Sequence, residues 1–319
     1  MAGEKAYTRR EFMGRSLSCA AHLGLMAAAS PLWMRDRWAS QTRFPVDASE
    51  PWGRLERIAD GIWALVSTPL KDRTTLCNGG IVAGRAGVAV IESLATDAGS
   101  SWLSAQAQRL AGRPATHVVL THFHSDHTGG LRAAAAGRDV QVFATGVTRD
   151  LAAERNRGAA LDVLESVVLL DSDRPSEIDL GGRSLRVVPR GGHTDSDVTF
   201  EIPEESLVFS GDLVWNGMFP NYVDAQPSRL SREVRVLRAT GATTYVPGHG
   251  PLADASALDA YIGLLDHVEE AARDAIQRGM TAAEAGAAYR LPSGLESWTL
   301  FSPGYFAQAI GAWMQELSV

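Results

Sequence analysis

Lysine is nearly absent from the chain. Only Lys5 and Lys71 occur among the 30 basic residues, so arginine supplies almost all of the positive charge, and it is scattered along the sequence. The formal net charge is -7. This leaves no basic surface of the kind that binds a nucleic-acid backbone. We therefore expect no nucleic-acid partner.

Cysteine is equally scarce. Cys19 lies near the N-terminus and Cys77 in the body of the chain. If the N-terminal segment is removed, Cys77 remains alone, which excludes a disulfide framework. No charged neighbour in the sequence would activate this thiol, so we expect Cys77 to be a small buried residue.

Long apolar runs are also missing. The weakly hydrophobic stretch Leu17–Leu32 is alanine-rich and shorter than the roughly 20 apolar residues that a membrane helix needs. We therefore expect no stable membrane span after processing. The preceding segment with Arg9-Arg10 resembles the twin-arginine export motif. Residues 1–40 are predicted to be a signal and linker recognised by the twin-arginine export machinery, which indicates a periplasmic or otherwise exported protein. An ordinary amphipathic N-terminal helix is the alternative.

One short segment of the chain, residues 121–130, is dense in potential metal ligands. They are His122, His124, Asp126 and His127. An apolar run at 117–120 predicts a strand before them, and an alanine-rich run at 131–136 predicts a helix after them. Imidazole and carboxylate together suit a borderline divalent ion such as zinc. The alternative, a polar turn with chance histidines, is disfavoured by three histidines and an aspartate at one strand end.

The remaining pattern alternates between strands and helices, with no internal repeat. Strands are predicted at 55–66 (a hairpin), 78–84, 87–92, 140–144, 185–188, 198–202, 206–209 and 243–246, and helices at 97–110, 146–166 and 228–239. Beyond residue 254 the pattern predicts three amphipathic helices. We divide the chain into a signal and linker at 1–40, a main domain at 44–253 and a C-terminal helical extension at 254–319 that packs on it.

Three further strand ends each carry a ligand-type residue beside glycine. These residues are His193, Asp212 and His249. Glycine permits the tight backbone that points such a side chain inward. Together with the first cluster they make seven ligand-type residues, five His and two Asp, which would support two divalent ions sharing a carboxylate. The spacing shows only that these residues could meet.

The ordered motifs H-x-H-x-D-H, G-G-H-T, S-G-D and P-G-H-G resemble those of the metallo-β-lactamase superfamily, over residues 55–251. The resemblance implies an α/β fold: an αββα sandwich of two mixed β-sheets flanked by helices, with metals at one edge. It also implies a division of the ligands, which the spacing alone does not give. His122, His124 and His193 would hold one metal, Asp126, His127 and His249 the other, and Asp212 would bridge both.

The resemblance further implies a hydrolase for small-molecule substrates. Two ions, Zn²⁺ first and Fe or Mn as alternatives, would provide a shared hydroxide that attacks an ester, thioester, lactone or β-lactam-type bond. Asp126 would be catalytic as well as a ligand, because it orients the nucleophile. A non-catalytic metal-binding protein or a redox protein of the same fold, serving an exported complex, is the alternative. Redox members carry an added flavodoxin-like domain, for which the chain after Pro251 is too short and too helical.

The substrate is less defined. Many zinc β-lactamases with similar motifs have cysteine or serine at the position of Asp212, so the aspartate makes a β-lactam substrate less favoured. Lactonases with similar motifs have a tyrosine at the position of Trp215, so the tryptophan makes a lactone substrate less favoured. Loops at 70–76 and 215–222 are candidates for substrate contacts; the second could equally be packed under the C-terminal helices. His117 is expected to be structural, and His267 to be either exposed or a core residue with a hydrogen-bond partner.

Overall fold

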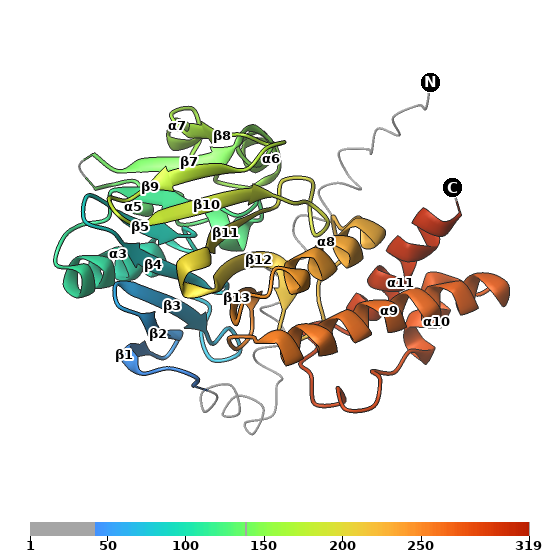
Figure 1. The fold of residues 1–319 in the computed structure, drawn as a ribbon. Helices are drawn as coiled ribbons and strands as arrows, with labels where there is room; N and C mark the ends of the chain where they lie inside the picture. The colour runs from blue at the N-terminus through green and yellow to red at the C-terminus, as the bar shows by residue number, and fades with distance from the viewer. Residues whose placement is uncertain (1–41, 138, 319) are drawn as a thin grey trace.

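The computed structural model describes residues 42–137 and 139–318, so the expected export signal with Arg9-Arg10 lies outside the described residues. Two β-sheets stack face to face, and helices cover both outer faces (Figure 1). The predicted αββα sandwich is therefore confirmed.

The first sheet has the strand order β1 to β8 in sequence. Its strands are β1 (Val46–Glu50), β2 (Gly53–Ala59), β3 (Ile62–Ser67), β4 (Gly79–Ala83), β5 (Val88–Ile91), β6 (His117–Val119), β7 (Gln141–Thr145) and β8 (Val168–Leu170). Strands β1 to β5 pair antiparallel and β5 to β8 pair parallel. Parallel neighbours bring their carboxyl ends to the same edge of the sheet, which positions the segment after β6.

The second sheet has the order β13-β12-β11-β10-β9. Its strands are β9 (Ser176–Asp179), β10 (Ser184–Pro189), β11 (Val198–Ile202), β12 (Leu207–Trp215) and β13 (Thr244–His249). The strands predicted at 198–202 and 206–209 are confirmed, and they pair antiparallel as β11 and β12, with the 3₁₀ turn η1 (Pro203–Glu205) between them. β12 and β13 pair parallel, so their far ends also meet at one edge.

Strand residues alternate between the two faces of each sheet, as the two-residue period of a strand requires. In β6, Val119 lies in the core between the sheets, whereas Val118 belongs to the cluster under α5 and α6. In β12, Phe209 faces the inter-sheet core and Val208 faces the C-terminal helices. Both faces are buried, which explains why the central strands are continuously apolar.

Nine α-helices occur in the described residues. They are α3 (Asp97–Ala111), α4 (Ser125–Thr128), α5 (Leu131–Ala134), α6 (Gly146–Arg155), α7 (Leu161–Leu164), α8 (Pro227–Ala239), α9 (Ala255–Gln277), α10 (Ala282–Ala288) and α11 (Gly304–Leu317). The prediction of one helical stretch at 146–166 is wrong, because the structure has two shorter helices there, α6 and α7. Gly158 has a left-handed φ of 71°, which separates α6 from α7.

Helices α8 to α11 cover the outer face of the second sheet (Figure 1). They share one hydrophobic cluster with β12 and β13. Three helices are predicted beyond residue 254, and the second of them, α10, begins at a capping box formed by Thr281 and Glu284. The predicted domain division near residue 254 stays a prediction. No helix in the described part of the chain is both long and apolar enough to span a membrane.

Candidate metal centre

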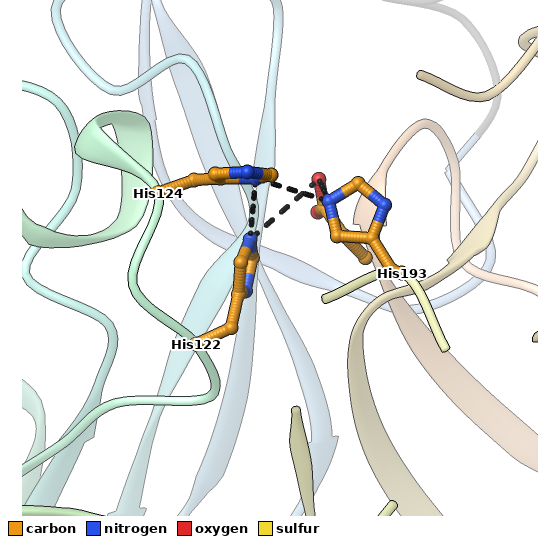
Figure 2. Close-up of side chains that lie close together, drawn as sticks. His122, His124 and His193 are labelled. Carbon is orange, nitrogen blue, oxygen red and sulfur yellow. Dashed lines mark hydrogen bonds and ion pairs between the residues drawn. The ribbon is translucent and has the colours of Figure 1, made fainter. Parts of the chain in front are cut away.

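The structure brings all seven predicted ligand side chains together. They come from the segment after β6, the short helix α4, the loop between β10 and β11, the middle of β12 and the end of β13, and all are buried. Figure 2 shows His122 and His124, from one segment of the chain, and His193, from another, pointing toward one another. Folding thus joins residues up to 127 positions apart (122 and 249) in one cluster.

Asp212 lies inside a strand, which differs from the prediction that it follows one, because β12 continues to Trp215. Gly211 has a φ of 52°, and the register with β13 shifts at this residue. A Cβ on Gly211 would lie 2.7 Å from Thr121 Oγ1, and one on Gly248 would lie 1.8 Å from Asp212 Oδ1. Gly248 therefore leaves the space that the carboxylate occupies, and Gly211 leaves the space that the Thr121 side chain occupies.

The first group of ligand atoms consists of three imidazole nitrogens and one carboxylate oxygen. His124 Nδ1 lies 3.1 Å from His122 Nε2 and 3.0 Å from His193 Nε2. Asp212 Oδ2 lies 3.3 Å from His193 Nε2 and 3.9 Å from His122 Nε2. A tetrahedral zinc ion with bonds near 2.0–2.1 Å separates its ligands by roughly 3.3 Å, which these spacings approximate.

The second group shares Asp212 with the first. Its Oδ1 lies 3.1 Å from His127 Nε2 and its Oδ2 lies 3.4 Å from His249 Nε2. Asp126 Oδ2 lies 3.1 Å from His249 Nε2 and 3.8 Å from His127 Nε2. Each group offers four ligand atoms within 4.8 Å of one another. This grouping matches the division that the family resemblance implies; the ligand roles themselves stay a prediction.

Unpartnered buried atoms show that these residues fit bound cations. Asp126 Oδ1, Asp212 Oδ1 and the Nε2 atoms of His127 and His249 are buried without a well-formed hydrogen bond. Buried polar atoms without a partner are rare, because losing their hydration is costly. Here they gather at one point and carry the donor types that divalent metals bind. Bound ions would satisfy Asp212 Oδ1 and the two imidazole nitrogens at once.

Polar contacts outside the seven ligands hold the imidazole rings in place. His124 Nε2 lies 2.9 Å from Asp224 Oδ2, and His127 Nδ1 lies 3.1 Å from Glu92 Oε1. Thr121 Oγ1 donates to Glu92 Oε1 at 2.5 Å. Sequence reasoning missed these residues. Only Glu92, directly after the apolar strand β5, gave a signal that could have been used.

The two aspartates of the cluster are held in the ionised form that metal ligands take. Burial raises the pKa of Asp126, but His127 and His249 outweigh this effect and lower it to about 2. Burial likewise raises the pKa of Asp212, and the neighbouring histidines bring it well below its usual range. Burial lowers the pKa of His193 to about 3. The centre therefore holds two carboxylates and at least one neutral imidazole, the forms that bind metals.

The other residues chosen from the sequence lie outside the centre. His117 stacks on Phe143 with ring centroids 5.2 Å apart, and His267 Nδ1 lies 2.9 Å from the Tyr289 hydroxyl. Cys77 is buried as predicted, and its thiol donates to the Asp126 carbonyl at 3.0 Å.

The loop at 215–222 is packed under the C-terminal helices, which was the second of its two predicted roles. Trp215, Met218, Phe219 and Tyr222 belong to the hydrophobic cluster shared with the C-terminal helices. The Asn216 amide donates to two backbone carbonyls, at 251 and 252. At 70–76, Leu70 and Leu76 are buried in the same cluster. These apolar side chains therefore support the site from behind.

Residues 73–249 match the family model described as the metallo-beta-lactamase superfamily. The chain belongs to this superfamily. The matched region contains every residue of the two ligand groups. The superfamily fold predicted from the motifs is therefore confirmed.

Known relatives place the chain among the hydrolases of the superfamily. A metallo-beta-lactamase type 2 of Bacillus cereus is 25% identical over 194 residues, which cover 59% of this chain and 72% of that protein. A hydroxyacylglutathione hydrolase of Rhodospirillum rubrum is 28% identical over 131 residues, 41% of this chain and 46% of that protein. The chain thus spans about half the length of that relative. A metallo-beta-lactamase structure from Pontibacter korlensis aligns with a TM-score of 0.58 at 26% identity, covering 67% of this chain and 99% of that one.

Proposed function

We propose that the protein is an exported, dinuclear metal-dependent hydrolase that cleaves an ester, thioester, lactone or β-lactam-type bond in a small molecule. One observation carries the proposal: two buried groups of ligand atoms share Asp212 within a superfamily fold. Zinc is the proposed ion because imidazole and carboxylate suit it, with iron and manganese as alternatives.

The ligand residues divide the work of the reaction. Two divalent cations, when bound, would lower the pKa of a shared water and polarise the scissile carbonyl. Asp126 presents Oδ1 as a buried acceptor without a partner, so it can hold the proton of an attacking water and orient it. Glu92 and Asp224 keep the rings of His127 and His124 aimed at the centre. Burial of the ligand set excludes bulk water.

Metal content and turnover test this proposal. Protein that is stripped of metal and reconstituted should bind about two equivalents of zinc, as a shared two-metal site requires. Asp126→Asn should retain the fold and lose most turnover on a panel of esters, thioesters, lactones and β-lactams. The matched control is Asp259→Asn on the exposed face of α9, which should change neither value. Binding of less than one equivalent by the unaltered chain would overturn the proposal.

The alternative, metal binding without catalysis, predicts a different result. It gives the same metal content with no turnover on any substrate, and no change on Asp126→Asn. A redox role would require an electron-transfer module. The described residues after Pro251 form the helices α9 to α11 instead, so we favour the hydrolase.

Export is proposed from the sequence alone. Arg9 and Arg10 precede an alanine-rich apolar run, as in twin-arginine signals. Replacing both arginines with lysine should retain the protein in the cytoplasmic fraction of the producing cell. Unchanged fractionation would contradict export by this route.

A further inference from the structure

Asn78 joins the two sheets beside the metal centre. It is buried and lies directly before β4 of the first sheet. Its side-chain amide donates to the carbonyl oxygens of Pro247 and Gly250, each at 2.8 Å, and its backbone N–H donates to that of Gly248 at 2.7 Å. These three carbonyls lie on both sides of His249 in the sequence. The contacts therefore fix the end of β13 that delivers this ligand.

The residue before Asn78 holds a second ligand of the same group. The buried thiol of Cys77 donates to the backbone carbonyl of Asp126 at 3.0 Å. One short segment, residues 76–78, thus contacts the backbone at two ligands. Leu76 begins this segment with a φ of 60°, in the left-handed region that non-glycine residues rarely adopt. Such a conformation persists only where the surrounding contacts enforce it.

The neighbouring strand end holds the third ligand. Residues 92–94 follow β5, which pairs antiparallel with β4, so they lie beside the first segment at the same edge of the sheet. Glu92 Oε1 lies 3.1 Å from His127 Nδ1. Ser93 donates to the His127 carbonyl through its N–H at 3.0 Å and its hydroxyl at 2.9 Å. Glu92 and Leu94 also have left-handed φ values, 70° and 61°. Two conformationally strained segments therefore hold the ligands of the second group.

The histidines of the first group have other supports. His124 Nε2 lies 2.9 Å from Asp224 Oδ2, and His122 Nδ1 lies 3.0 Å from Thr121 Oγ1. Within the described residues, the side-chain hydrogen bonds of Asn78 do not reach this group. Loss of the Asn78 amide should therefore disturb the second group and spare the imidazoles of the first.

We propose that Asn78 is a positioning residue for the second of the two metal ions. Its amide fixes the end of β13 against the first sheet, so that His249 keeps its place beside Asp126 and Asp212, whose Oδ2 atoms lie 3.1 and 3.4 Å from its Nε2. The inference rests on the proposed two-metal centre and adds that the two ions depend on separate supports. A chain without this amide should hold one ion well and the other weakly.

Asn78→Asp is the most direct variant. It keeps the shape of the side chain and the oxygen that accepts from the Ser67 N–H, but it sets a carboxylate oxygen against two carbonyl oxygens. In competition with a chelator, the second equivalent of zinc should bind about tenfold more weakly, as is usual when a partner outside the ligand set is lost. The affinity for the first equivalent should stay almost unchanged. Asn78→Ala removes the same donor without adding a charge and should act in the same direction.

Thr281→Ala is the control for a general loss of stability. It removes the capping box of α10, which lowers the free energy of unfolding without altering any contact of the two ligand groups. Both zinc affinities should stay unchanged in this variant. Equal weakening of both ions by Asn78→Asp, or the same weakening in Thr281→Ala, would overturn the inference.

Crystal structures of the metal-free proteins give a readout that depends neither on turnover nor on bound zinc. In Asn78→Asp we expect His249 to move away from Asp126, while the three histidines of the first group keep their positions. An unmoved His249, or an unchanged affinity for the second zinc, would overturn the inference. If the unaltered chain binds less than one equivalent of zinc, the hydrolase proposal fails, and the place of His249 in the metal-free variant still decides whether Asn78 positions it.

Discussion

Asp224 offers the sharpest test of how the centre is held. Its Oδ2 lies 2.9 Å from His124 Nε2, while His124 Nδ1 faces His122 and His193. Burial raises the pKa of Asp224, but its hydrogen bond with His124 and the charge of Arg155 outweigh this effect and lower it. An ionised carboxylate thus fixes the ring and raises the basicity of the nitrogen that faces the centre. Asp224→Asn keeps the shape and removes the charge.

The expected loss follows from what such contacts contribute to metal sites. Replacing a carboxylate that orients a ligand histidine costs about 10- to 100-fold in metal affinity or activity, or about 1.4–2.7 kcal/mol. We expect the lower part of this range because the Asp224 carboxylate is partly exposed and solvent screens the contact. Arg155→Gln alters the other side of the same carboxylate. It should have a smaller effect, since the bond between His124 and Asp224 remains.

Competition with a chelator measures this loss directly. Zinc affinity and kcat are compared for the unaltered chain, Asp224→Asn, and Asp259→Asn as an exposed aspartate that also pairs with an arginine. Unchanged melting temperatures establish that the fold is retained. Zinc affinity of Asp224→Asn within twofold of the unaltered chain would refute the proposed role of Asp224.

Three further predictions follow from local geometry. Gly248→Ala should abolish metal binding, because the added Cβ would lie 1.8 Å from Asp212 Oδ1. Gly263→Ala is the control and should leave metal binding unchanged, because its added Cβ meets no atom within 4 Å. Equal metal contents of the two variants would contradict this prediction. Burial raises the pKa of Cys77 to about 12, so its alkylation, followed by peptide mass mapping, should occur only on unfolding; rapid labelling of native protein would argue otherwise. Burial raises the pKa of Asp197 from 3.8 to about 7, so the folded state retains a proton that the unfolded state releases. Its contribution to the free energy of unfolding is then lost as the pH rises through that window. Asp197→Asn should remove this loss in urea titrations between those pH values, and an unchanged slope would count against it.

Local pattern identified the elements whose signals lie in neighbouring residues. The hairpin predicted at 55–66 is formed by β2 and β3, and the second of the three helices predicted beyond residue 254 is α10, which begins at the Thr281 capping box. Both depend on contacts within a few residues, which the sequence displays directly. The prediction of one helix at 146–166 was wrong, because the left-handed backbone at Gly158 interrupts the helix, although the composition of the segment favoured a continuous one.

The sequence by itself determined the ligand types and their order. Five histidines and two aspartates stand in glycine-rich motifs, and that spacing identified the superfamily. Their convergence required the fold, since register and strand pairing decide which of these motifs meet. Only the tertiary structure showed that Asp224 supports His124 across 100 positions and that Trp215 packs in the core. Such contacts join segments far apart in the chain, so no local pattern encodes them.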